Sequence, residues 1–142
     1  AVGTPVPSLG GQHVQIGQQH APYNSTPPTS GPHWDAPADW GIYHDPVPEE
    51  RWVHNLEHGG IVILYNCPQD CPDLLNRLDA LFKTAPRSKL GNVKLLITPY
   101  HTAPNRLTLV AWNYYLPLDD YDDAVVRGFM LNHLDKAPEQ VM

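Results

Sequence analysis

The fold of this chain depends on the stretch Val53-His54-Asn55-Leu56-Glu57-His58-Gly59-Gly60-Ile61-Val62-Ile63-Leu64-Tyr65. Its first half places two imidazoles and a carboxylate close together, and its second half is a continuous apolar run rich in β-branched residues. Such a run is typical of a strand that is buried on both faces of a sheet. Because the glycine pair ends the polar half, the stretch predicts a polar site placed directly against a buried strand.

The residues before the glycines have the composition of a short helix. Proline suits the first helical position and acidic side chains suit the positive end of the helix dipole, as in Pro48-Glu49-Glu50. If the helix continues to Gly59, His54 and His58 lie one turn apart on the same face. If residues 51–55 are extended instead, the two imidazoles belong to different elements. The sequence leaves both arrangements open.

The residues after the apolar run predict two more helices and two more strands. Leucines at helical spacing indicate a helix over about 70–84, and Asp119 and Asp120 precede a last helix at about 121–134. The strands are expected at 93–98 and, as the longest one, at 107–115. This order is typical of an α+β domain in which a small β-sheet is covered by two helices.

The first third of the chain is rich in proline, with nine of the sixteen prolines before Arg51. It also holds Trp34 and Trp40, and such rings are too apolar for a solvated tether. We expect this third to wrap around the domain, with residues 1–20 as an N-terminal arm and residues 21–142 as a single α+β domain. Within the arm, the alternating patch His13-Val14-Gln15-Ile16 predicts an edge strand.

Length and charge restrict the classes of function. A chain of 142 residues has the size of one domain with its own core. Its net charge of -6, without any cluster of Lys or Arg, argues against nucleic acid and anionic membranes as partners. No run approaches the roughly 18 apolar residues of a transmembrane helix.

The first residue and the cysteines point to export. Ala1 in place of Met predicts that a signal peptide has been removed. Cys67 and Cys71, with three residues between them, either close a small disulfide loop or offer two thiolates to a metal. An oxidising location outside the cytoplasm favours the disulfide.

Three spaced motifs occur in order: Tyr23-Asn24-Ser25-Thr26-Pro27-Pro28-Thr29-Ser30-Gly31-Pro32-His33, Trp40-Gly41-Ile42-Tyr43 and Val53-His54-Asn55-Leu56-Glu57-His58-Gly59-Gly60. Together they resemble the bacterial domain-of-unknown-function family 3105, and the similarity extends from about His13 to Glu139. The resemblance implies an exported bacterial protein that is extracellular, at the cell surface or periplasmic, and it implies no particular activity. It also selects among the eight histidines, because His33, His54 and His58 lie inside the motifs and His13 lies in a similar His-Val pair.

These histidines predict a metal site. We expect His33, His54 and His58 to converge, with His13 or Glu57 as a further ligand. Neutral imidazoles suit copper, zinc, nickel and iron, and for an exported protein without a thiolate set copper is our first choice and zinc the second. The alternative without a metal is that His54 and His58 satisfy backbone carbonyls around the proline-rich loop.

Two other functions compete with simple metal binding. His54-Asn55-Leu56-Glu57-His58 has the H-x-x-E-H order of inverted zinc peptidases, but these take a third ligand from a downstream helix, and the only later glutamate is Glu139, close to the C-terminus. We therefore expect no catalytic activity and keep a metal-dependent enzyme as the second alternative. The first alternative is a structural subunit of an extracellular assembly or filament, whose N-terminal arm docks on the sheet edge of a neighbouring copy. That role is compatible with metal binding.

Overall fold

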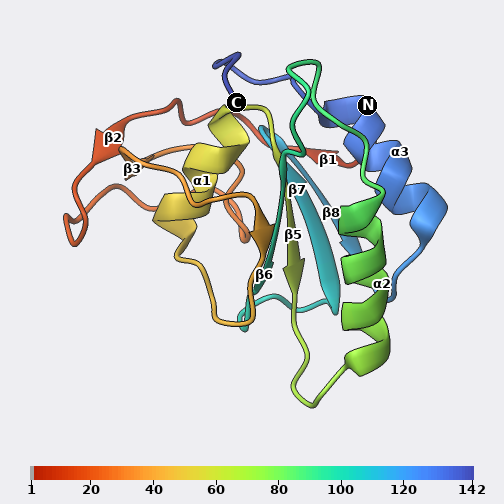
Figure 1. Cartoon of the computed structure of the whole chain (residues 1–142). Helices are drawn as coiled ribbons and strands as arrows, with labels where there is room; N and C mark the ends of the chain where they lie inside the picture. The colour runs from red at the N-terminus through yellow and green to blue at the C-terminus, as the bar shows by residue number, and fades with distance from the viewer. Residues whose placement is uncertain (1) are drawn as a thin grey trace.

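The computed structural model describes residues 2–142 and is built on a mixed sheet with helices on both faces (Figure 1). The order of strands across the sheet is β1 (Thr4–Pro5), β8 (Tyr114–Leu118), β7 (Leu107–Ala111), β5 (Ile61–Tyr65), β6 (Leu95–Pro99) and β4 (Gly41–Ile42). Strands β4, β6 and β5 are parallel, whereas β5, β7, β8 and β1 are antiparallel neighbours. The α+β class predicted from the sequence is confirmed.

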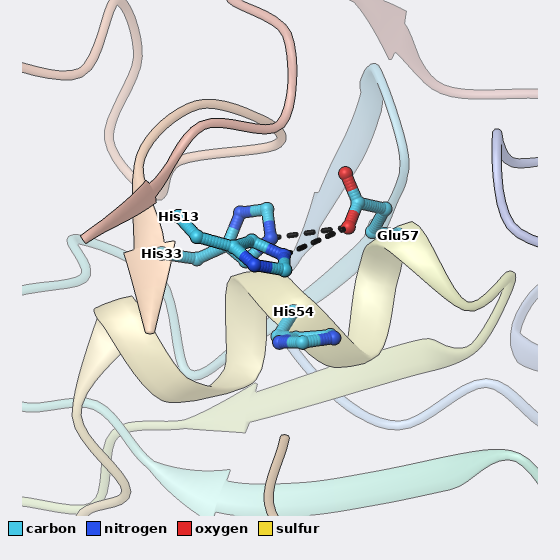
Figure 2. Close-up of side chains that lie close together, drawn as sticks. All are labelled: His13, His33, His54 and Glu57. Atoms are coloured by element: carbon cyan, nitrogen blue, oxygen red, sulfur yellow. Dashed lines mark hydrogen bonds and ion pairs between the residues drawn. The ribbon is translucent and has the colours of Figure 1, made fainter. Parts of the chain in front are cut away.

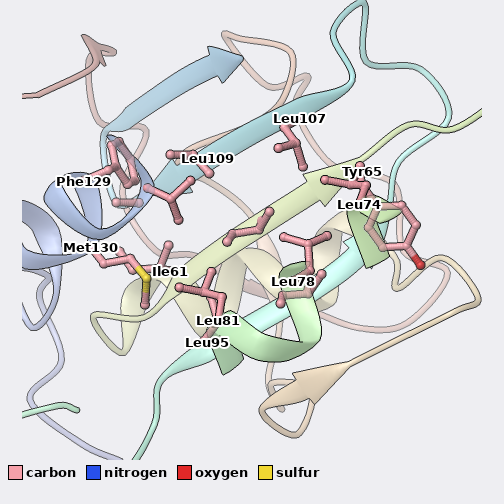
Figure 3. Close-up of a cluster of buried hydrophobic side chains, with 14 of the residues drawn as sticks. Ile61, Tyr65, Leu74, Leu78, Leu81, Leu95, Leu107, Leu109, Phe129 and Met130 are labelled. Atoms are coloured by element: carbon pink, nitrogen blue, oxygen red, sulfur yellow. The ribbon is translucent and has the colours of Figure 1, made fainter. Parts of the chain in front are cut away.

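The apolar run forms β5, an interior strand of the sheet, and it is buried on both faces as predicted. The helices around it are α1 (Glu49–Glu57), α2 (Pro72–Lys83) and α3 (Asp123–His133). Ile61 and Ile63 face α2 and α3, while the alternate residues Val62 and Leu64 face α1. Figure 3 shows the first of these two cores, where side chains of α2 and α3 pack against the strands. Each fully buried aliphatic side chain of this kind stabilises the fold by about 1.5–3 kcal/mol.

Helix α1 lies between the sheet and the proline-rich third of the chain. Its apolar side chains Trp52, Val53 and Leu56 are completely buried and belong to the core cluster on that face of the sheet. The other side of α1 is covered by a separate two-stranded parallel sheet, formed by β2 (His13–Val14) and β3 (His33–Trp34) (Figure 1). The polar face of α1 is therefore buried as well.

The turn that ends α1 is fastened to the C-terminal tail. Gly59 has a φ of +87°, a left-handed conformation that strongly favours glycine, and a Cβ there would lie 2.9 Å from the Cα of Asp135. The N–H of Asp135 donates to the carbonyl of Gly59 at 2.9 Å. Lys94, which is buried, donates from Nζ to the carbonyl of His58 at 2.7 Å and to Asp135 at 3.1 Å. Residues far apart in sequence thus hold the end of α1 in place.

The predicted long strand over residues 107–115 is wrong, because the chain turns within it. It forms the hairpin β7–β8, in which Ala111 pairs with Tyr114 and residues 112–113 make the turn. Asn113 adopts a φ of 69°, which Asn tolerates better than most residues. The turn contains no Gly or Pro, and Asn113 is the one polar residue between the aromatic residues Trp112 and Tyr114, so the reversal is hard to recognise from composition.

The disulfide between Cys67 and Cys71 is confirmed, with an S–S distance of 2.04 Å, and it closes the loop just before α2.

At the β1 edge of the sheet, the start of the arm pairs with its own chain, where Thr4 of β1 is aligned with Tyr115 of β8. Within residues 2–142, every helix is too short or too polar to cross a membrane.

Candidate metal centre

Three histidines and a glutamate from three segments meet over the polar face of α1 (Figure 2). His13 and His33 are aligned partners in the parallel strands β2 and β3, while His54 and Glu57 lie one turn apart on α1. Each residue offers one donor atom, and the four donor atoms all lie within 4.8 Å of one another. We call His13, His33, His54 and Glu57 the inner group.

One carboxylate oxygen is the focus of the inner group. Oε1 of Glu57 lies 3.1 Å from Nε2 of His33 and 3.9 Å from Nε2 of His13. The ring centroids of His33 and His54 are 4.8 Å apart, and those of His13 and His33 are 4.9 Å apart. Figure 2 shows that the rings of His13 and His33 direct a nitrogen toward Glu57.

Backbone carbonyls fix the orientation of two imidazoles. Nδ1 of His33 lies 2.8 Å from the carbonyl of Gly31, and Nδ1 of His54 lies 2.7 Å from the carbonyl of Trp34. Because a carbonyl can only accept a hydrogen bond, Nδ1 of each neutral ring carries the proton and Nε2 keeps its lone pair. Metal-binding histidines are typically held in this way by a partner on the other ring nitrogen.

Burial keeps the inner group closed on the protein side and open at one edge. The side chain of His33 is 0% exposed and that of Glu57 is 8% exposed, whereas that of His13 is 49% exposed. Burial lowers the pKa of His33 to about 4, so this ring is neutral at physiological pH. Burial, and then the neighbouring Glu139, raise the pKa of Glu57. Since Nε2 of neutral His33 carries no proton, its approach to Glu57 requires either a proton on the carboxyl group or a cation between the two.

A second set of donors adjoins the first and shares His54 with it. Nε2 of His58 lies 3.8 Å from Oε1 of Glu139, and Nε2 of His54 lies 4.0 Å from the same atom. We call His54, His58 and Glu139 the outer group, whose donor atoms also lie within 4.8 Å of one another. His58, which we expected to join His33, belongs to this outer group instead.

Glu139 is the residue of the cluster that sequence reasoning missed. We discounted it as a ligand because it stands close to the C-terminus, but the tail folds back and the N–H of Glu139 donates to the carbonyl of Glu57 at 3.1 Å. A single glutamate in a polar tail has no motif that would reveal this position. The lack of a downstream carboxylate is therefore no longer an argument against the peptidase interpretation, although α1 does end at Glu57.

The donors of the two groups could hold a metal ion. Imidazole nitrogens and carboxylate oxygens are common ligands of copper and zinc, and a site with three or four such donors and one accessible edge can also admit a small exogenous ligand. In the described residues 2–142, these two groups are the clusters of His, Cys, Asp and Glu whose geometry suits an ion.

Comparison with known proteins gives a family and no activity. The model of a protein family described as a protein of unknown function (DUF3105) matches residues 13–142. That range contains every member of the inner and outer groups. No curated protein and no solved structure matches the chain.

Proposed function

The chain belongs to the DUF3105 family, whose description assigns no activity, and we propose from the geometry that it binds a transition-metal ion in the inner group. Copper is the preferred ion and zinc the second choice, because nitrogen-rich sites bind Cu²⁺ more tightly than other divalent ions of the first row. The proposed role is binding without catalysis.

The observation that carries this proposal is the direction of the lone pairs. Nδ1 of His33 and Nδ1 of His54 donate to carbonyls, so each neutral ring keeps a lone pair on Nε2; Nε2 of His33 lies 3.1 Å from Oε1 of Glu57, and Nε2 of His54 lies 4.0 Å from Oε1 of Glu139. Nε2 of His33 forms a hydrogen bond with Glu57 only when the carboxyl group carries a proton, and an ion would take the place of that proton. An ion bound by these nitrogens and by Glu57 would satisfy all of them.

The proposed location is outside the cytoplasm. The Cys67–Cys71 disulfide supports an exported protein, because such bonds persist in oxidising compartments and are rare in the reducing cytosol. An extracellular, surface or periplasmic setting would also fit a site that draws its ion from solution at the half-exposed edge formed by His13.

The bound ion would fasten the proline-rich third to the domain. His13, His33 and His54 come from the arm, the loop and α1, so a single ion would add a link among three segments that are already held by a strand pair, by hydrogen bonds such as those between Ala38 and Asn55, and by packing against the core. A ligand present at 100 times its dissociation constant stabilises the folded state by about 2.7 kcal/mol. For a domain of this size, that corresponds to a rise in Tm of roughly 5–10 °C.

The test is metal analysis with a matched pair of histidine variants. The purified protein should hold copper or zinc in stoichiometric amount, and chelation should lower its Tm and increase hydrogen exchange in residues 20–60. His13→Ala should weaken binding at least tenfold without unfolding the chain, because this ring is half-exposed. His44→Ala, at an exposed histidine outside both groups, should bind as the wild type does. Absence of a bound ion together with an unchanged Tm would rule out the proposal.

A second candidate function is assembly through the arm. The arm is joined to the sheet edge by the short pairing of β1 with β8 and by the bond from the N–H of Val6 to the carbonyl of Asn113 at 2.8 Å. Exchange of this arm between copies would place His13 of one copy in the site of the next. Deletion of residues 1–12 followed by mass measurement in solution tests this candidate, because an oligomer should dissociate, and a wild-type chain that is already monomeric would contradict it.

A further inference from the structure

We propose that the cluster binds two metal ions, the second of them in the outer group of His54, His58 and Glu139. This inference rests on the proposed function, since it extends the inner site to a pair of adjacent sites. Each ion would then have two imidazole nitrogens and one carboxylate oxygen from the protein, with His13, His33 and Glu57 around the first and the outer group around the second.

The number of donors exceeds what one ion uses. A tetrahedral ion takes four ligands, and catalytic or exchangeable sites often take three from the protein. Here four imidazoles and two carboxylates form one continuous cluster, in which ring centroids of neighbouring histidines are 4.7–5.2 Å apart. Nε2 of His54 has one lone pair and can serve one ion at a time. When it serves the outer ion, the inner ion keeps a complete set of three donors.

The side chains of His58 and Glu139 are oriented for binding an ion, as those of the inner group are. Nδ1 of His58 lies 3.3 Å from the carbonyl of Met142, which directs Nε2 toward Glu139. Although the side chain of Glu139 is 41% exposed, its Oε1 atom is buried and has no hydrogen-bond partner among residues 2–142. A buried carboxylate oxygen without a partner is costly, and a cation at this position would remove that cost.

The charges also favour two cations. The carboxylates of Glu57 and Glu139 lie side by side, and the N–H of Glu139 bonded to the carbonyl of Glu57 keeps them there. Within the described residues, their ion-pair partners are the histidines of the cluster. Lys94 is close by, but its Nζ is directed to the carbonyl of His58 and to Asp135. Two adjacent carboxyl groups that contact no Lys or Arg are a place where divalent cations would be favourable.

The experiment is a count of ions per chain. The full chain is loaded with excess Cu²⁺, freed of weakly held metal by gel filtration, and examined by native mass spectrometry and elemental analysis. We expect two ions per wild-type chain and one per chain in Glu139→Ala. Because Glu139 lies in the tail beyond α3, this variant removes no core side chain. Val141→Ala, at an exposed position of the same tail, is the matched control and should retain two.

The outcomes separate this inference from the one on which it rests. A wild-type ratio of one, or a ratio of two that Glu139→Ala leaves unchanged, overturns the outer site while the inner site stands. A ratio of zero contradicts the proposed function itself. His58→Gln provides a second variant and should also reduce the ratio from two to one.

Discussion

Gly11, in the arm, lies directly against Glu57 of the inner group, and Gly11→Ala is a sharp test of that group. A Cβ at residue 11 would lie 1.8 Å from Oε2 of Glu57 and 3.4 Å from the ring of His33. Because carbon and oxygen atoms without a bond stay more than 3.0 Å apart, either the carboxylate or the arm has to move by more than about 1 Å. Metal–ligand distances tolerate only about 0.2 Å. The ion would therefore lose Glu57 or, through the arm, His13.

The expected loss follows from that displacement. Displacing a supporting group of a metal site typically costs 10–100-fold in affinity, which equals about 1.4–2.7 kcal/mol. The protein without metal should stay folded, since the displaced atom is the end of a flexible side chain. Affinity is measured by competition with a chelator of known strength, and stability by thermal unfolding of the metal-free protein.

The matched control is Gly128→Ala in α3, where nothing lies within 4 Å of the added Cβ. That alanine should leave metal affinity unchanged and should stabilise the helix by up to about 1 kcal/mol. If the affinity of Gly11→Ala for copper is within threefold of the wild-type affinity, the inner group is not the site. The reason is that the added Cβ has to displace either Glu57 or the arm.

Three further predictions concern the structure around the centre. Lys94→Met should reduce the free energy of unfolding by about 3–5 kcal/mol in urea titrations, because it leaves Asp135 without its buried partner; a loss below 1 kcal/mol would contradict this account of the pair. Burial alone would raise the pKa of Asp135, but hydrogen bonds from Ser88, a backbone N–H and Lys94 lower it, so its contribution to stability is present above about pH 4 and is lost as the pH falls through the folded-state value. The stability difference between wild type and Asp135→Asn should accordingly shrink on acidification, and a difference that is constant with pH would refute the argument. Replacing both Cys67 and Cys71 with Ser should lower stability by about 2 kcal/mol, as expected for so short a loop, without changing metal affinity; a loss of metal would show that the loop supports the centre.

Much of the scaffold could be predicted from local patterns. The apolar run predicted β5 and the leucine spacing predicted α2, whereas the acidic start at Glu49 left α1 open between a helix that ends at Gly59 and an extended segment, and the structure has the helix. Periodicity and capping are properties of neighbouring residues, so they can be recognised without tertiary information. The hairpin β7–β8 was missed because a single polar residue, Asn113, between two aromatic residues is the only local mark of its turn.

The candidate site was predictable in its residue types and only partly in its arrangement. The sequence motifs selected His33, His54 and His58, with His13 or Glu57 as a further ligand, and the structure brings His33 and His54 together with both His13 and Glu57. The separation of His58 from His33 could not be foreseen, because it depends on how β3 crosses α1. Glu139 could not be foreseen either, since its position depends on a tail that is held by Gly59 and Asp135, and such contacts leave no local pattern.

The return of the tail to α1 also has a consequence for how the protein would acquire an ion. The donors extend from His13 to Glu139, so the cluster is among the most non-local sets of contacts in the chain. Non-local contacts form late in folding, because the intervening chain has to be ordered first. An emerging or unfinished polypeptide would therefore offer only separate imidazoles, each of which binds a metal ion weakly. Tight binding of the ion would require both flanks of the domain to be folded. Proteolytic trimming on either flank would release the metal before it unfolded the sheet.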